Sequence, residues 1–459
     1  MSRWSFQGGA TERHGLSMAG ARELCERVLG FSMADYARIY INSGWRGFTR
    51  TATNRITTAG GSSDVSVQIS SIFGKRVAQV TTNRLDNDSL KQAVRDSEVL
   101  ARVAPEDPEY LPELGPQRYT EVSGYYDTTG NMSPEARAKA AALSIKAAEA
   151  DQMIAAGFID VHAGAEVVAT SEGLFAFYPG TSVASTLTIR TPDGSSSGWA
   201  GDEAADWQEI ESQRIAEDAV RKCRMWKEKT SLDSGRYVAV LEPTAVGMLM
   251  LRMRGTFGAR QADEGRSYFS KSGGANRIGE KLFDSRITMI SDPTAVNAET
   301  APFSREGQPV NRETWIEQGD LKGLSYSRAW AEKKGVEAKA GPSNLLMSGG
   351  DSSVKDMIKS TERGVLITRF WYIRELNPRT ISYTGLTRDG TFLIENGRIT
   401  RPVNNFRFNQ SLVELLNSVE MMGTPTRVAA GENSSAGTPI VVPPMKVREF
   451  HLSSVSDAI

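Results

Sequence analysis

The sequence predicts an α+β protein in two parts: an N-terminal domain of antiparallel sheet with helices, and a C-terminal, mostly β domain with a large sheet and a few helices. The chain has 459 residues, more than one hydrophobic core usually serves. Helical and strand patterns alternate up to about residue 230, and β-type runs with glycine-rich loops follow. The pair Asn396-Gly397 between two apolar runs predicts a hairpin, because both residues of that turn need positive φ. We therefore expect domains at residues 1–230 and 231–459.

The composition is that of an ordinary globular chain. A hydrophobic content of 39% and a charged content of 24% are typical of soluble domains. The formal net charge of −1 provides no field that would attract nucleic acid or an anionic membrane. Cys25 and Cys223 lack metal or CxxC spacing and lie on apolar helical stripes, so we expect buried, free thiols. No signal-peptide pattern and no bilayer-spanning apolar run is found, and we expect a cytoplasmic protein.

Helices and strands alternate through the N-terminal part. Ser17 is expected to cap the first helix, and Gly30 to end it in the left-handed conformation. Ser89 opens a second helix with a capping-box pattern, and Ser133-Pro134 opens a third. The expected helices cover residues 17–30, 89–103, 133–151 and 206–227. The expected strands cover residues 36–42, 47–52, 65–71, 75–82, 157–163, 166–171, 182–190 and 197–200.

The C-terminal part is dominated by β-type runs. Residues 365–373 are apolar, β-branched or aromatic at most positions, which predicts one strand covered on both faces inside a large sheet. The segments 353–363 and 410–422 predict short helices, and a helix is also expected within residues 242–265. Glycine-rich loops are expected at residues 272–276, 341–351 and 423–438.

Four segments together resemble the TldD/PmbA family, the modulator-of-DNA-gyrase proteins that form a two-subunit peptidase. They are SEGLFAFYPG at 171–180, SYFSKSGGANRIGEKLFD at 267–284, REGQPVNRETWIEQGDLKGL at 305–324, and the run from Gly364 to the FLIENGRITRPV hairpin. They follow the family order along nearly the whole chain, while the N-terminal third matches in pattern. The resemblance implies a metallopeptidase fold.

The resemblance also implies a helix that carries His-Glu-x-x-x-His in the catalytic members. Two imidazoles hold zinc there, and the glutamate takes a proton from the metal-bound water. In this chain the equivalent segment is 242–265, and Met250, Leu251 and Gly255 occupy the motif positions. We therefore expect no metal ligands and no catalytic residues in this segment.

Replacement ligands are not evident elsewhere in the sequence. The three histidines are His14, His162 and His451, and no two of them have ligand spacing. The family's C-terminal cysteine ligand is also missing, because no cysteine follows Cys223. We expect no cofactor in this chain, and any zinc to be held by a partner subunit.

Several charged or aromatic residues near this helix and the signature strand are candidate contacts for a peptide or a partner chain. Arg252 and Arg254 lie opposite the apolar face of the helix, where they are either a solvated face or ligands for carboxylates. Arg388-Asp389 in a glycine-bounded turn forms either an internal salt bridge or part of a cleft. Asp263-Glu264 could serve acid–base chemistry as paired carboxylates, but with no nucleophile or metal ligand nearby in sequence it is interpreted as a structural turn. The full set of candidates is Arg252, Arg254, Arg369, Tyr372, Arg374 and Arg388.

The resemblance implies a paired assembly in which one subunit keeps the zinc motif and its relative lacks it. Our first hypothesis is a catalytically silent subunit, a pseudoenzyme that forms a heterodimer with a TldD-like catalytic subunit and shapes a chamber for extended or unfolded peptides. Proteolysis or peptide maturation would be the activity of the pair, and we expect the chain alone to be inactive. A metal-free homodimer that binds peptides or acts as a scaffold, and an enzyme repurposed for peptides or natural products, remain alternatives.

Overall fold

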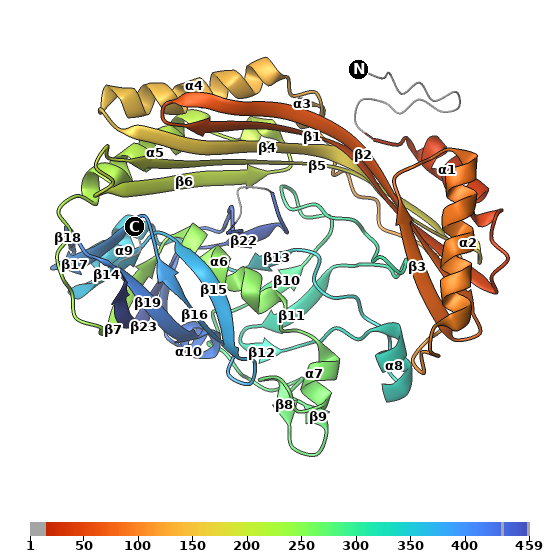
Figure 1. Cartoon of the computed structure of the whole chain (residues 1–459). Coiled ribbons are helices and arrows are strands. Elements are labelled where there is room, and N and C mark those ends of the chain that lie inside the picture. The colour runs from red at the N-terminus through yellow and green to blue at the C-terminus, as the bar shows by residue number, and fades with distance from the viewer. Residues whose placement is uncertain (1–14, 433–435, 457–459) are drawn as a thin grey trace.

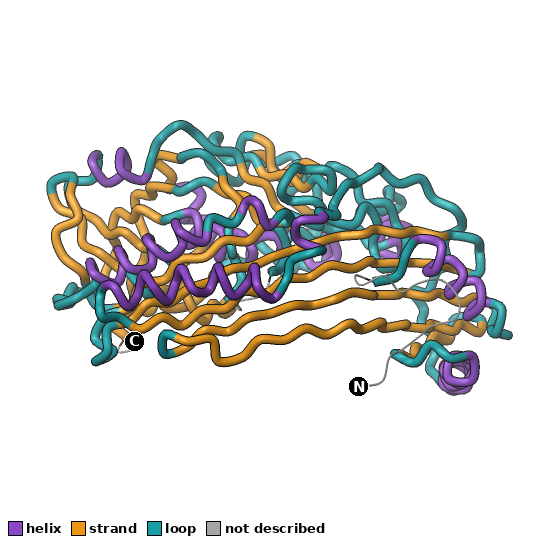
Figure 2. The backbone as a smooth tube through the Cα atoms, turned by 90° about the horizontal axis from the view of Figure 1, so that it is seen from above, coloured by secondary structure: helices purple, strands orange, loops and turns teal. Residues whose placement is uncertain are grey.

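The computed structural model describes residues 15–432 and 436–456. It confirms the α+β class, with an antiparallel sheet and helices in the N-terminal half and large mixed sheets with few helices in the C-terminal half. The long strands of the first half arch over the second half (Figure 1). Seen from above, these strands run side by side along the length of the molecule (Figure 2). The division at residues 230 and 231 stays a prediction.

The N-terminal sheet contains six of the described strands in the order β3-β2-β1-β4-β5-β6, all antiparallel. Consecutive strands in this sheet are joined by turns or by helices that lie on one face. The strands are β1 (Tyr36–Ala52), β2 (Arg55–Phe73), β3 (Arg76–Thr82), β4 (Ile154–Thr170), β5 (Phe175–Arg190) and β6 (Ser197–Ala204).

Helices cover the outer face of this sheet. Ser17 caps the first helix and Ser133 caps the alanine-rich one, as predicted, each by accepting a hydrogen bond from a backbone N–H of the first turn. Two apolar clusters result, one under the first two helices and one under the later pair. The helical elements are α1 (Met18–Leu29), α2 (Asn87–Val103), α3 (Asp127–Gly130), α4 (Pro134–Ala150), the 3₁₀ turn η1 (Trp207–Glu209) and α5 (Ser212–Met225).

The two faces of the sheet differ because side chains alternate along each strand. Ile39 and Ile41 of β1 are buried against α1 and α2. Their neighbours Asn42 and Arg46 point to the opposite face, which lies over the C-terminal half. The sheet thus presents an apolar outer face to its helices and a largely polar inner face to the second half.

Two predicted strand pairs are each a single strand, which corrects the sequence analysis. Residues 36–42 and 47–52 both belong to β1, and residues 157–163 and 166–171 fall on β4 apart from the last. Gly44 and Gly164 lie in the predicted interruptions, but both are mid-strand, at a point where β1 and β4 approach closely. A Cβ on Gly164 would lie 2.2 Å from the Ser43 carbonyl oxygen. Glycine here permits close backbone approach and does not mark a turn.

The second half contains a mixed sheet of nine described strands, with β20 attached at β23 and the others in the order β15-β16-β19-β23-β7-β14-β17-β18. β14 pairs with β7 in parallel and with β17 antiparallel, so it lies inside the sheet as predicted. The strands are β7 (Gly235–Leu241), β14 (Arg363–Ile367), β15 (Phe370–Asn377), β16 (Ser382–Thr387), β17 (Thr391–Glu395), β18 (Arg398–Pro402), β19 (Asn405–Ser411), β20 (Val419–Met422) and β23 (Met445–Ser456).

Smaller elements complete this half. A second sheet has the order β12-β11-β10-β13-β22-β21 among the described strands, and β8 pairs with β9. The strands are β8 (Ser270–Lys271), β9 (Ala275–Asn276), β10 (Met289–Ser291), β11 (Glu313–Glu317), β12 (Asp320–Leu321), β13 (Leu345–Met347), β21 (Thr426–Arg427) and β22 (Ile440–Val442). The helices are α6 (Pro243–Arg254), α7 (Ala259–Asp263), α8 (Arg328–Lys334), α9 (Val354–Lys359) and α10 (Leu412–Asn417).

The predictions for the hairpin at residues 396–397 and for the strand at residues 365–373 have different outcomes. Asn396 and Gly397 have φ of 51° and 74° and join β17 to β18, which confirms the predicted hairpin. Residues 365–373 are not one strand. Thr368 leaves the ladder of β14, because its N–H and hydroxyl both bind the Gly390 carbonyl oxygen, and β15 begins at Phe370 beside β16.

Four details of the predicted helices are also wrong. Gly30 has φ −66°, a right-handed value, because the chain continues in a further turn. Asp86 caps α2 by accepting from the Ser89 N–H, so the helix starts before Ser89. Ile210 is extended between η1 and α5 and breaks the helix predicted over 206–227. The helix predicted over 410–422 ends at Asn417, and β20 follows.

Cys25 and Cys223 are free and buried, as predicted. Burial raises the pKa of the Cys25 thiol to about 12 and raises that of Cys223 as well. A thiolate is the reactive form, so we expect neither thiol to react with a disulfide reagent at pH 8 in the folded protein. In urea both should react. Reaction of one thiol in the folded protein would contradict this burial.

Among the residues that the structure describes, no helix has both the length and the apolar character that crossing a membrane requires.

Candidate functional site

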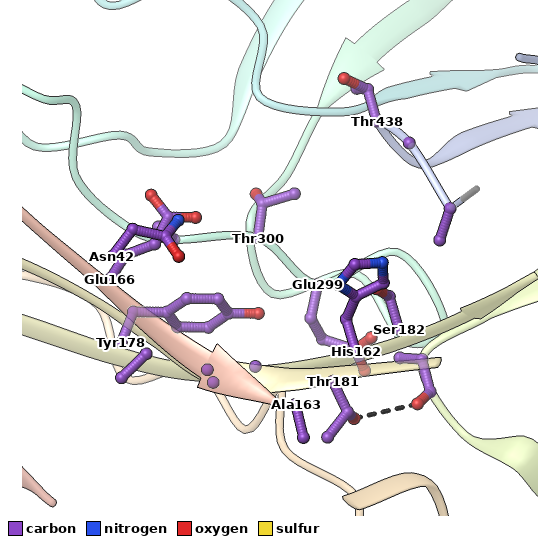
Figure 3. A pocket seen from close by; sticks show the side chains of 18 of the residues that line it. Asn42, His162, Ala163, Glu166, Tyr178, Thr181, Ser182, Glu299, Thr300 and Thr438 are labelled. Atoms are coloured by element: carbon purple, nitrogen blue, oxygen red, sulfur yellow. Dashed lines mark hydrogen bonds between the residues drawn. The ribbon is translucent and has the colours of Figure 1, made fainter. Parts of the chain in front are cut away.

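A large cavity lies between the inner face of the N-terminal sheet and the second half. Its volume is about 1010 Å³. Strands β1, β4 and β5 form one wall, and loops at residues 299–305 and 436–439 form the other, together with Arg254 at the end of α6 (Figure 3). The alternation of the sheet therefore aims a row of polar side chains into a space of peptide dimensions.

Two tyrosine–carboxylate pairs line or border this cavity. The Tyr40 hydroxyl donates to Glu166 Oε2 at 3.0 Å, and the Tyr126 hydroxyl donates to Glu299 Oε1 at 2.6 Å. Burial, together with the hydrogen bond to Glu299, raises the pKa of Tyr126 to about 12. Burial and Glu166 raise the pKa of Tyr40 also. Both phenols thus remain protonated donors at neutral pH.

A second group of charged residues lies farther along the same strands. Asp160 is fully buried and accepts from Arg46 Nε at 2.7 Å and Nη2 at 3.2 Å. Its Oδ2 also lies 3.0 Å from His162 Nε2. Ser182 is the cross-strand neighbour of His162 on β5, and both side chains lie in the cavity (Figure 3). A carboxylate that orients an imidazole is the arrangement of a general acid or base.

No role was expected for His162, yet this residue lines the cavity. Asp160 and His162 are two residues apart on a strand, and this spacing puts both on one face. The partner Arg46 is 114 positions away in the sequence. The period-2 pattern of β4 was therefore a usable signal for the pair, but the arginine required the strand register.

The helix α6 is where the resemblance places a metal site, and its residues do not fit a metal. Met250 is fully buried in the main core cluster, Leu251 packs against that cluster, and Gly255 follows the helix end without a side chain. Zinc sites need imidazole, thiolate or carboxylate donors. Within residues 15–432 and 436–456 no three His, Cys, Asp or Glu side chains are grouped to hold a metal ion. His14 lies outside the described residues.

Arg252 and Arg254 both make internal contacts. Arg252 Nη2 lies 2.9 Å from Glu432 Oε1, and Arg254 Nη1 donates to the Pro342 carbonyl oxygen at 2.7 Å. Burial lowers the pKa of Arg254. Both side chains are only partly exposed, and Arg254 lines the large cavity. A role for either in holding a peptide or a partner stays a prediction.

A second cavity of about 480 Å³ follows the first along the same strands. It brings together Arg369 and Arg388, two of the predicted contacts, with Arg46 as a wall shared by both cavities. Arg374 stays outside its lining, pairs with Glu432 at 3.3 Å and covers the exposed ring of Tyr372.

Asp263 and Glu264 are held in place by neighbouring side chains. Asp263 is buried and accepts from Trp330 Nε1 and Asn276 Nδ2, both at 2.8 Å. Glu264 pairs with Arg260 at 3.0 Å. These contacts agree with a structural turn and engage both carboxylates.

Comparison with known proteins matches most of the chain. Residues 234–454 match the model of the PmbA/TldA metallopeptidase C-terminal domain, and residues 128–225 match that of the central domain. The crystal structure of TldE from Thermococcus kodakarensis superposes with a TM-score of 0.81 at 20% identity, over 94% of this chain and 99% of that one. At this identity the likeness shows the fold.

Two relatives are metalloproteases by name. A metalloprotease of Methanothermobacter thermautotrophicus is 26% identical over 302 residues, which cover 59% of this chain and 63% of the relative. A metalloprotease TldD homolog of Buchnera aphidicola is 24% identical over 243 residues, which cover 49% of this chain and 48% of the relative. The chain thus matches about a half to two thirds of the length of these relatives.

Proposed function

On the premise that this chain belongs to the PmbA/TldD metallopeptidase family, we propose that it is the metal-lacking subunit of a TldD/TldE-type peptidase. It contributes walls to a chamber for extended peptides, and a partner that carries His-Glu-x-x-x-His contributes the zinc and the hydrolytic step. The chain's own residues bind and orient the peptide.

The observation that supports this proposal is the composition of α6. The positions that would hold His and Glu are Met250 and Leu251, and the methionine is fully enclosed by apolar neighbours. A buried apolar residue at a ligand position leaves neither a donor nor solvent access for a metal-bound water. The family fold is retained, while α6 carries none of the motif's metal ligands.

The second cavity and the end strand β15 support a role in peptide binding. β15 is an end strand of the nine-stranded sheet, and its Trp371 lines the cavity. An end strand offers backbone N–H and C=O groups to an extended peptide, which pairs with it independently of most side chains. An extended peptide is therefore a suitable occupant.

Co-expression with a relative that carries His-Glu-x-x-x-His tests this proposal. We expect a stable complex that cuts an unstructured peptide such as casein, while neither chain cuts it alone. A matched control carries alanine at both motif histidines of the relative, which should leave the complex intact and inactive. If this chain elutes alone after co-expression, the proposal is wrong.

The molar mass of the isolated chain in solution distinguishes a homodimeric scaffold from a subunit of a heterodimer. A metal-free dimer of this chain that retains unfolded peptides without a partner would replace the heterodimer as the explanation.

The Asp160–His162 pair favours a second candidate, an enzyme that uses acid–base chemistry without a resident metal. Asp160 orients the imidazole through its bond to Nε2, which leaves Nδ1 for a substrate proton. If the isolated chain turns over peptides in the presence of a chelator, His162→Ala should lower kcat by about 10²–10⁴-fold. Turnover that is unchanged by this substitution, or none at all, excludes this candidate.

A further inference from the structure

The second cavity is rich in arginine. It lies between the inner face of the sheet and the segment that connects β14 to β15, beside Gly431 and Glu432. Five guanidinium groups line it against two carboxylates. The arginines are Arg46, Arg50, Arg190, Arg369 and Arg388, and the carboxylates are Asp389 and Glu432.

Arg369 is the buried member of this group. Its side chain is 7% exposed, and Nη1 lies 3.4 Å from Asp389 Oδ2. Its Nε has no hydrogen-bond partner among the described residues. The Trp199 ring lies 4.3 Å and the Trp371 ring 5.4 Å from the guanidinium. Burial lowers the pKa of Arg369 to about 10, so the group is still charged at neutral pH. A buried cation with an unmet donor favours an anionic partner.

Both carboxylates of the cavity are already engaged, Asp389 by two of the lining arginines and Glu432 by groups outside the lining. Asp389 accepts from the Ser197 hydroxyl at 2.7 Å as well as from Arg369, and Arg388 Nε lies 3.8 Å from it. Glu432 accepts from Arg252, from Arg374 and from the Ile373 N–H. Two of its partners, Arg252 and Arg374, lie outside the cavity lining. Asp160 offsets Arg46, and Asp389 offsets one of Arg369 and Arg388, so the five lining arginines still retain an excess of positive charge.

The two cavities are consecutive along three strands. The first is lined by residues around Gly164 on β4, and the second by Phe158 and its neighbours. At about 3.3 Å per residue, six residues of strand span roughly 20 Å. An extended peptide whose end lies among the arginines would therefore place a residue some four positions away beside His162, and one some six positions away beside Gly164 in the large cavity.

We propose that this arginine cavity binds a carboxylate of an extended peptide, and so fixes the register in which the peptide lies along the sheet. Guanidinium binds carboxylate in a bidentate manner, and Trp199, Trp371 and Phe158 supply apolar walls for the adjoining side chain. The proposal deepens the proposed function, since it rests on a peptide in the cleft. The carboxylate belongs either to the peptide C-terminus or to an acidic side chain, and the chemistry of recognition is the same.

Fluorescence anisotropy with matched seven-residue peptides tests this. All carry an N-terminal dye, and they differ in a free or amidated C-terminus and in a Glu or Gln within the sequence. We expect loss of the recognised carboxylate to weaken binding to the full chain about tenfold, which corresponds to one charge-assisted bidentate contact. Comparison of the amidated peptide with the Glu-to-Gln peptide shows whether the recognised carboxylate is the C-terminus or the side chain.

Variants locate the site. Arg50 and Arg190 are exposed, so the double variant Arg50→Gln, Arg190→Gln should fold normally. It should bind the peptide with the recognised carboxylate as weakly as the matched peptide without it. Arg221→Gln removes an exposed charge on α5, on the outer face of the sheet, and should change nothing. Arg369→Lys keeps the positive charge but cannot form a bidentate contact, so it should weaken binding only of the peptide that carries the recognised carboxylate.

Equal affinity for peptides with and without carboxylates, no binding of either, or unchanged selectivity in the double variant would overturn the proposal. The outcome is separable from that of the co-expression experiment. If the complex is active but binds peptides with and without the carboxylate equally, only this inference is wrong. If binding depends on the carboxylate but no partner complex forms, this inference holds and the proposed subunit role is wrong.

Discussion

Replacement of Glu203 by alanine is expected to lower the free energy of unfolding by about 3–5 kcal/mol, the usual cost of breaking a buried ion pair from one side. Glu203 on β6 lies 3.1 Å from Arg427 on β21, and their side chains are 3% and 9% exposed. Arg427 also donates to the Asn297 carbonyl oxygen at 2.6 Å. The pair joins the inner face of the sheet to the second half at the edge of the large cavity. Urea unfolding measures the loss.

The double variant Glu203→Leu, Arg427→Met is the matched control. It removes both charges and keeps comparable volume, so the loss should shrink to about 1 kcal/mol or change sign. Burial raises the pKa of Glu203, an effect that Arg427 only partly offsets. The protonation of this carboxyl therefore adds to the free energy of unfolding in full below the pKa of the unfolded chain. This addition is lost as the pH rises through the higher pKa of the folded protein. A single variant as stable as the parent protein would show that this pair does not hold the halves together.

Trp226→Ala is expected to cost about 3–5 kcal/mol, as for other large core aromatics. Trp226 follows α5, within the predicted N-terminal domain, but its fully buried ring belongs to a cluster with Val240, Leu366 and Phe392 of the second half. Its Nε1–H donates to the Val403 carbonyl oxygen at 3.0 Å. The residue anchors the connection between the two halves.

Trp226→Phe separates the two contributions. It keeps most of the apolar contact and leaves the Val403 carbonyl oxygen without its donor, so we expect a loss of about 1–3 kcal/mol. Thermal or urea unfolding checks both variants. A loss below about 1 kcal/mol for the alanine variant would mean that the halves are joined mainly by other contacts.

Much of the fold was predictable because it depends on local signals. Asn396-Gly397 needs only two residues to specify a hairpin, and Ser17 and Ser133 need only the next turn. The continuity of β1 through Gly44 and of β4 through Gly164 was not predictable, because glycine in a strand and glycine in a turn look alike in sequence. Only the register between β1 and β4 shows that each glycine makes room for the other strand.

The site was less predictable because its contacts are long-range. The absence of histidine from residues 242–265 was plain from the sequence. The convergence of Arg369, Arg46 and Arg388 on one cavity was not, because Arg46 lies more than 300 positions before the other two. Glu432 likewise joins Arg252 and Arg374 from a loop that carries no periodic pattern.

Metal content and peptidase activity of the purified, isolated chain test the central claim most directly. After incubation with excess zinc and removal of free metal, plasma mass spectrometry should find far less than one zinc per chain, and casein should remain uncut. The same preparation mixed with its His-Glu-x-x-x-His partner should gain both. One tightly held zinc per isolated chain, together with cleavage of casein, would contradict the account.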